Sequence, residues 1–139
     1  MTESKVVIKN ISAEKFWDEN KAIPDQVRVS TNVNITGLDH RENNLSIPFV
    51  VNIGYDPSVA QITFRGNVSV KGEKAELDEI ERKYENKENP PDRLVQNIIN
   101  KSMVEATLIS RSLEIPPPLP LPKVQSQKNL EQNDSLNYV

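Results

Sequence analysis

Few side chains in this chain of 139 residues could perform acid–base or nucleophilic chemistry. It has no cysteine and a single histidine, His40, which lies in the polar segment 37–44 beside Asp39, Arg41 and Glu42. Without cysteine, a thiolate nucleophile, a cysteine-ligated zinc site and a disulfide scaffold are excluded. A lone histidine in a polar segment with no pocket motif is expected to be solvated. The alternative is that His40 acts as a catalytic base.

The highest density of charge lies at 73–88 (EKAELDEIERKYENKE), with seven acidic and four basic residues. Clustered carboxylates can bind a cation, but the Asp-x-Asp-x-Asp-Gly spacing of a calcium loop is missing and basic residues alternate with the acidic ones. Leu77, Ile80 and Tyr84 follow an i, i+3, i+7 spacing, which predicts one thin apolar stripe on a helix. We expect a solvated, charged helix here and no metal ligands.

Sequence motifs for other chemistries are absent. The four glycines are scattered at positions 37, 54, 66 and 72, so no glycine-rich phosphate loop occurs. Neither a Gly-x-Ser-x-Gly nucleophile elbow nor a His-Glu-x-x-His zinc motif is present. The sequence therefore predicts a protein that is not an enzyme, with no catalytic residue and no cofactor. A small-molecule hydrolase or transferase remains the open alternative.

The overall charge also restricts the class of partner. Seventeen Lys and Arg against twenty Asp and Glu leave a net charge of −3, without the basic excess that neutralises phosphates. We therefore expect no nucleic-acid partner. No apolar run approaches the length of a membrane span, and the first residues, MTESKVVIKN, lack the apolar core of a secretory signal. These features predict no membrane insertion and a cytoplasmic protein.

Apolar and polar residues alternate through most of the first half, which predicts antiparallel strands with one buried face. The alternating runs are 6–13, 27–35, 45–55 and 60–70. In the first run the alternation changes phase near Lys9-Asn10, which indicates a β-bulge or a strand end. Pro48, which cannot donate a ladder hydrogen bond, predicts an edge or a bulge inside the third run.

Residues 14–25 connect the first two runs and are too many for a tight hairpin. We expect a crossover that passes over part of the sheet. It contains two adjacent aromatic residues, Phe16 and Trp17. Burial in the core is the default interpretation, and a lid over an apolar groove is the alternative.

A wide apolar face marks a long helix at 91–113. Its main stripe is Val95, Ile99, Met103, Ala106, Ile109 and Leu113, and Leu94, Ile98 and Leu108 widen it. One sheet face can cover a single stripe, so the extra width predicts a second neighbour such as the same helix of another subunit. We expect an oligomer interface at Val95, Ile98, Ile99 and Leu108, with packing inside one chain as the alternative.

Prolines dominate residues 115–122 (IPPPLPLP), so this strip ends the helix and must be extended. Packing back on the domain is favoured over recognition by a proline-binding domain. With Phe16 and Trp17, its Leu119 and Leu121 could line an apolar channel for an extended, unfolded polypeptide. Residues 123–139 are polar and are expected to be a disordered tail.

Two short phrases and the order of the predicted elements resemble the SecB family of protein-export chaperones. Residues 10–14, Asn-Ile-Ser-Ala-Glu, match that family's Asp-Ile-Ser-Phe-Glu-like phrase at the end of its first strand. Residues 115–122 look similar to its Phe-Pro-x-Leu-x-Leu-x-Pro phrase at the end of the main helix. The resemblance covers about residues 5–122. The chain departs from the family in lacking a second C-terminal helix and in carrying the charged segment 73–88.

The patterns and the resemblance together predict an α+β fold, a four-stranded antiparallel meander sheet packed against one long helix. This SecB-like domain is expected at 1–122, with 73–88 as a charged helical insert, 115–122 as an extended strip and 123–139 outside it. The resemblance implies an ATP-independent holdase that binds non-native polypeptides as a homo-oligomer, a dimer or tetramer. We expect clients to contact Phe16, Trp17, Leu119 and Leu121. The alternative is a structural or adaptor subunit that docks one fixed protein partner.

Overall fold

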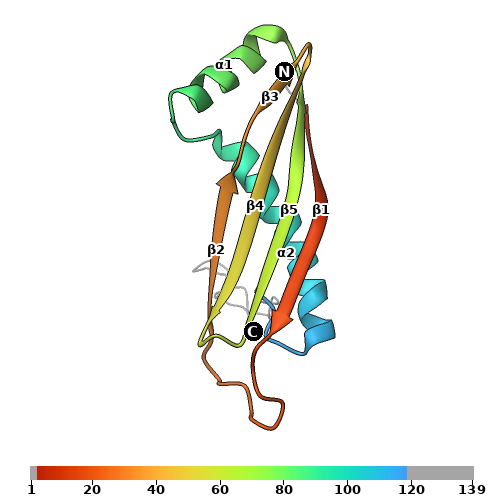
Figure 1. Cartoon of the computed structure of the whole chain (residues 1–139), viewed down its shortest axis with the longest axis vertical. Helices are drawn as coiled ribbons and strands as arrows, with labels where there is room; N and C mark the ends of the chain where they lie inside the picture. The colour runs from red at the N-terminus through yellow and green to blue at the C-terminus, as the bar shows by residue number, and fades with distance from the viewer. Residues whose placement is uncertain (1–2, 119–139) are drawn as a thin grey trace, which may run out of the picture.

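The computed structural model describes residues 3–118 of the chain. It is an α+β structure in which one antiparallel sheet carries two helices (Figure 1). Its elements are β1 (Glu3–Lys15), β2 (Arg28–Ile35), β3 (Asp39–Arg41), β4 (Asn44–Asp56), β5 (Ala60–Lys71), α1 (Lys74–Glu85) and α2 (Asp92–Leu113). The general α+β class is confirmed. The sheet has five strands in place of the four predicted, and α1 and α2 correspond to the charged helix and the long helix that the sequence predicted.

The strand order in the sheet is β1-β5-β4-β2, and β3 pairs with β4 beyond the end of β2. The strands from β2 to β5 follow one another as a meander, whereas β1 adds to the outer edge of β5. The first two strands therefore form opposite edges of the sheet. The sequence predicted that the connection between them would pass over part of the sheet. Instead, residues 16–27 pass around the end of the sheet (Figure 1).

The polar segment 37–44 is not simply a loop. Asp39, His40 and Arg41 pair with Ser46, Leu45 and Asn44, respectively, and form a tight hairpin with the start of β4. A three-residue strand has no hydrophobic alternation, so the sequence offered no periodic signal for it. His40 consequently lies in a paired strand.

Pro48 lies where its missing N–H is tolerated. β2 ends at Ile35 and β3 begins at Asp39, so the neighbouring strand is interrupted beside this proline. The carbonyl of Pro48 accepts a hydrogen bond from the Thr36 N–H at 2.9 Å. Because the nitrogen and the carbonyl of a strand residue point to the same side, the Pro48 nitrogen also faces the interruption. The irregularity predicted at this position is confirmed.

A register shift between Ile8 and Asn10 confirms the phase change predicted in the first strand. Gly66 on β5 lies opposite Ile8, where the two strands approach closely. A Cβ atom at Gly66 would overlap the Val7 carbonyl oxygen and would lie only 2.8 Å from the Phe49 ring. Position 66 therefore requires a residue without a side chain.

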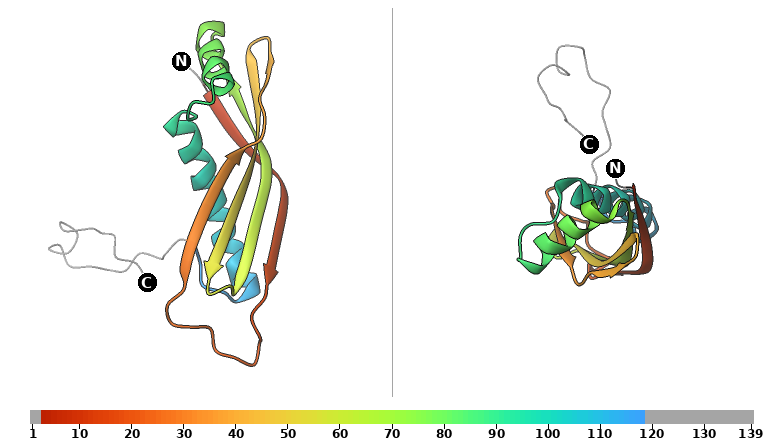
Figure 2. Two further views of the ribbon diagram at one scale, coloured as in Figure 1. Left: turned by 60° about the vertical axis from the view of Figure 1, so that its left-hand side comes forward. Right: turned by 90° about the horizontal axis from the view of Figure 1, so that it is seen from above.

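The core lies between one face of the sheet and the two helices. Alternate residues of β4 from Leu45 to Tyr55 are buried, and every fourth residue of α2 faces them. The buried α2 residues are Leu94, Ile98, Ser102, Ala106 and Ser110. Three of these five are small, which lets the helix approach the sheet closely along its C-terminal half. No described helix covers the opposite face of the sheet (Figure 2).

Replacing Ser102 with alanine is expected to raise the free energy of unfolding by about 1 kcal/mol. The Ser102 hydroxyl is fully buried and has no hydrogen-bond partner among residues 3–118, so folding costs its hydration without compensation. Ser110 is equally buried but donates to the Thr107 carbonyl at 2.7 Å, which makes Ser110→Ala the matched control. Urea denaturation measures both variants. A less stable Ser102→Ala protein would contradict the prediction.

Candidate functional site

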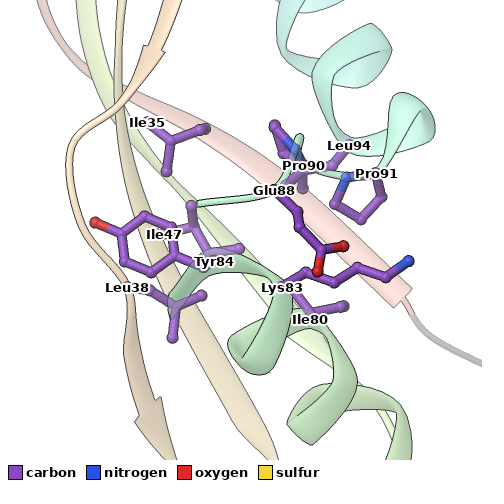
Figure 3. A pocket seen from close by; sticks show the side chains of 10 residues that line it. All are labelled: Ile35, Leu38, Ile47, Ile80, Lys83, Tyr84, Glu88, Pro90, Pro91 and Leu94. Carbon is purple, nitrogen blue, oxygen red and sulfur yellow. The ribbon is translucent and has the colours of Figure 1, made fainter. Parts of the chain in front are cut away.

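An apolar pocket lies between α1, the sheet and the chain that connects α1 to α2 (Figure 3). It has about 340 Å³ of empty space, part of it open to solvent. Leu38 and Ile47 line it from the sheet side, Ile80 and Tyr84 from α1, and Pro90 from the connection. The cavity itself is only about 40 Å³, far smaller than a pocket that encloses a drug-sized ligand, so it suits a single side chain.

The local sequence explains the walls of this pocket. Leu77 is fully buried and holds the charged helix α1 against the sheet, which places Ile80 and Tyr84 over the pocket. The Pro90-Pro91 pair ends the connection, because proline is tolerated at the start of a helix and cannot continue the preceding one. Its rings add apolar surface with little freedom to move.

A wider hollow continues from the pocket along the edge strand β2. It has about 860 Å³ of empty space, part of it open to solvent. The residues that line it are Val33, Asn34, Ile35, Tyr84, Glu85, Lys87, Glu88 and Pro90. β2 hydrogen-bonds only to β4, so its other edge is unpaired within the described part of the chain. We call the pocket and this hollow together the α1 groove. An apolar pocket that opens into a hollow of mixed polarity beside a free strand edge is suited to an extended peptide, because the edge can add main-chain hydrogen bonds.

The aromatic residues predicted to contact clients lie elsewhere. Phe16 is 50% exposed and follows the end of β1, where its N–H donates to the Val59 carbonyl at 2.9 Å. Trp17 packs in part against the core, and its indole N–H donates to the Ala22 carbonyl at 3.2 Å. Both are at the end of the sheet opposite α1, since β1 pairs at that end with the start of β5.

The proline-rich strip is described only as far as residue 118. Ile115 is buried, and the Tyr55 hydroxyl donates to the Pro116 carbonyl at 2.6 Å. The start of the strip therefore packs back on the sheet. Burial raises the pKa of Tyr55 to about 12, so this hydroxyl remains a donor at neutral pH. Leu119 and Leu121, the other two predicted contacts, lie outside the described residues, as does the predicted tail at 123–139.

One residue of the predicted oligomer interface must be corrected. Ile98 has no exposed surface, because it packs inside the chain's own core, and it cannot contact a second subunit. Val95 and Ile99 are half-buried, whereas Leu108 is 55% exposed. Val104, one turn before Leu108, is similarly exposed, so the outer flank of α2 carries an uncovered apolar pair.

The expectation of a solvated His40 is also wrong. Its side chain is only 14% exposed, and its Nδ1 lies 2.8 Å from Glu81 Oε1 and 3.7 Å from Asp78 Oδ1. Its Nε2 lies 3.1 Å from the Glu42 carbonyl oxygen. The hydrogen bond with Glu81 is the main cause that raises the pKa of His40. The two carboxylates belong to α1, and Glu81 is 41 residues after His40 in the chain, so no local motif predicted this contact.

Sequence reasoning also missed the α1 groove, although part of its signal was present. Ile80 and Tyr84 belong to the thin apolar stripe predicted at 73–88, and Pro90 and Pro91 lie at the start of the helix predicted at 91–113. The sequence could not show that the sheet would cover only part of this stripe. Leu38 and Ile47 belong to segments that the sequence placed in a loop and in a buried strand.

The fold and the site define an α+β protein with an open sheet face and an apolar groove at one end. Comparison of the chain with family models, with curated proteins and with solved structures finds no match. Neither α1 nor α2 combines the length and the apolar character that a membrane-spanning helix needs.

Proposed function

We propose that this protein is an ATP-independent, SecB-like holdase of the cytoplasm that binds unfolded or non-native polypeptides and is linked to protein export. The observation that supports this proposal is the α1 groove, where an apolar pocket opens beside the unpaired edge of β2. Apolar contact tolerates many sequences, and main-chain pairing tolerates nearly all of them. A site that combines the two suits a client without a fixed structure.

Binding in this proposal needs no chemical step. A client segment lies extended along Val33, Asn34 and Ile35, and one apolar side chain enters the pocket between Ile80 and Ile47. The rim carries both signs of charge, with Lys83 and Glu88 among the lining residues, so it does not select clients strongly by charge. One such site binds weakly, and several sites in a homo-oligomer would multiply the affinity by raising the effective concentration.

Oligomer formation has its own candidate surface, separate from the groove. Val104 and Leu108 on α2 and Ile11 on β1 are each about half exposed. β1 is the other edge strand of the sheet, and its outer edge is unpaired among residues 3–118. Exposed apolar side chains together with a free strand edge favour association.

The same surface supports the second candidate function, a non-catalytic structural or adaptor subunit. In that case Ile11, Val104 and Leu108 would dock one fixed protein partner, and the groove would not bind unfolded chains. Light scattering separates the two functions. A defined homo-oligomer of the purified protein favours the holdase, and a monomer that associates only with a partner favours the adaptor.

The test of the holdase function is suppression of aggregation of a chemically unfolded client. Replacing Tyr84 with alanine is expected to weaken client binding about tenfold, because it removes a 40% exposed aromatic ring from the groove. Because the Tyr84 side chain is partly exposed, we expect the Tyr84→Ala variant to fold. The measurement is the protein concentration that halves client aggregation.

Phe16→Ala is the matched comparison, because it removes an aromatic ring of similar exposure, 50% against 40%, from the opposite end of the sheet. The α1 groove predicts that Tyr84→Ala has the larger effect. Impairment by Phe16→Ala alone would place the client site on the crossover, as the sequence predicted. No suppression by well-folded wild-type protein would reject the holdase function.

A further inference from the structure

Three potential metal ligands converge where α1 packs against the β3–β4 hairpin. Asp78 and Glu81 are three residues apart on α1, so both carboxylates extend from one face of the helix. His40 is on β3 beneath them, and one ligand atom from each of the three residues lies within 4.8 Å of the others. All three side chains are partly buried, at 14%, 45% and 33% exposed for His40, Asp78 and Glu81.

The hydrogen bonds of His40 determine which ring nitrogen faces the carboxylates. Nε2 lies 3.1 Å from the Glu42 carbonyl oxygen, which can only accept, so Nε2 carries a proton. Nδ1 is directed at Glu81 Oε1, 2.8 Å away, and an ionised carboxylate also only accepts. Two acceptors cannot face each other without a positive charge between them. A proton on Nδ1, which makes His40 an imidazolium paired with Glu81, satisfies this contact, and a metal cation that displaces the proton satisfies it in the same way.

We infer that His40, Asp78 and Glu81 bind a divalent transition-metal ion, Zn²⁺ or one of similar preference. Its ligands are His40 Nδ1, Asp78 Oδ1 and Glu81 Oε1, with water completing the coordination. The Nε2–H bond to the Glu42 carbonyl is then the outer hydrogen bond that metal-bound histidine usually makes. The site lies apart from the α1 groove's lining and does not depend on the holdase function.

The ligand spacing fits such an ion. Two ligands about 2.1 Å from a tetrahedral metal are about 3.4 Å apart. The observed separations from Nδ1, 2.8 Å to Glu81 and 3.7 Å to Asp78, bracket this value, so small side-chain shifts suffice. Lys74 pairs with Asp78 through the other carboxylate oxygen, Oδ2, at 3.0 Å, which leaves Oδ1 directed at the site.

The donor set also selects the class of ion. One imidazole nitrogen and two carboxylate oxygens suit zinc and its transition-metal neighbours. Calcium requires six or more oxygen ligands, and magnesium retains its water and prefers oxygen alone. Two carboxylates and a neutral imidazole carry a charge of −2, which the ammonium of Lys74 beside Asp78 offsets only in part, so the cluster still attracts a cation. Bound there, the ion would clamp α1, the helix that forms one wall of the α1 groove, to the hairpin.

Calorimetric titration of the untagged full chain with ZnCl₂ tests this inference, with MgCl₂ as the comparison. We expect one zinc per chain and no comparable binding of magnesium. Glu81→Gln and His40→Gln each remove one ligand and are expected to weaken zinc binding by at least tenfold. Glu79→Gln is the matched control, because Glu79 is on the same helix, is 57% exposed and is not in the cluster.

Thermal unfolding gives a second readout. At a free zinc concentration ten times the wild-type dissociation constant, we expect the wild-type Tm to rise by about 5 °C and the Glu81→Gln Tm to rise by less than about 2 °C. If Glu81→Gln does not fold, Asp78→Asn replaces it, since that carboxylate is the most exposed of the three. Absence of zinc binding, or zinc binding that all of these ligand variants leave unchanged, would overturn the inference.

Discussion

Replacing Gly66 with alanine is expected to lower the free energy of unfolding by about 3 kcal/mol. The added Cβ would overlap the Val7 carbonyl oxygen and would lie 3.0 Å from Ile8 Cα and 2.8 Å from Phe49 Cζ. Two of these three atoms belong to the backbone of β1 beside the bulge, so no side-chain rotation relieves the contact. The strand itself would have to move away from β5.

Gly54→Ala is the control for this variant. Gly54 is also inside a strand, β4, but the nearest atom to its added Cβ is Ser30 Oγ at 3.5 Å, an ordinary contact. Both substitutions change the same residue type in the same secondary structure, so their difference isolates the close approach of β1. We expect Gly54→Ala to change stability by less than about 1 kcal/mol in urea denaturation. Equal destabilisation by the two variants would refute the explanation.

Leu77→Ala is expected to cost about 3 kcal/mol, because it empties a fully buried position. Leu77 is also the only buried residue of α1, and the rest of that helix is mostly charged. Its loss should therefore release α1 from the sheet before the remainder unfolds. In the variant, hydrogen exchange should show lost protection over 74–85, while the amides of β4 and β5 remain protected.

Leu108→Ala removes the same atoms from a side chain that is 55% exposed, and it is the control. We expect it to change the free energy of unfolding by about 0.5 kcal/mol or less in urea denaturation of the monomer. The contrast between the two leucines would show that burial, and not residue type, sets the cost. Comparable losses at both positions in the monomer would contradict this explanation.

Much of the secondary structure could be predicted because its signals are local. The helix expected at 91–113 is α2 at Asp92–Leu113, since a wide apolar stripe and the flanking prolines mark both of its ends. The charged helix within 73–88 is α1, and its stripe residue Leu77 is the one that is buried. The strand alternation predicted β1, β2, β4 and β5, and the phase change predicted the bulge. Each of these signals is contained in a few neighbouring residues.

The side of α2 that faces the sheet could not be predicted. Ile98 and Leu108 both widen the apolar face in the sequence, yet Ile98 is enclosed and Leu108 is half exposed. The buried line follows every fourth residue along α2, and only the position and twist of the sheet select that line. An apolar pattern identifies what can be buried, and the packing partner decides what is.

Contacts between residues that are far apart in the chain could not be predicted from local sequence patterns either. His40 was assigned to solvent because its neighbours in the chain are polar, but its neighbours in space are Asp78 and Glu81 of α1. The α1 groove depends in the same way on a short strand, a helix and a pair of prolines coming together.

The sequence by itself determined the α+β class, most of the strands, both helices and the absence of common catalytic motifs, because hydrophobic period and residue type are properties of the chain. The tertiary structure alone decided the strand order, the enclosure of Ile98, the groove beside β2 and the convergence of one histidine with two carboxylates. These depend on which surfaces meet, and that is set by packing between elements distant in the chain.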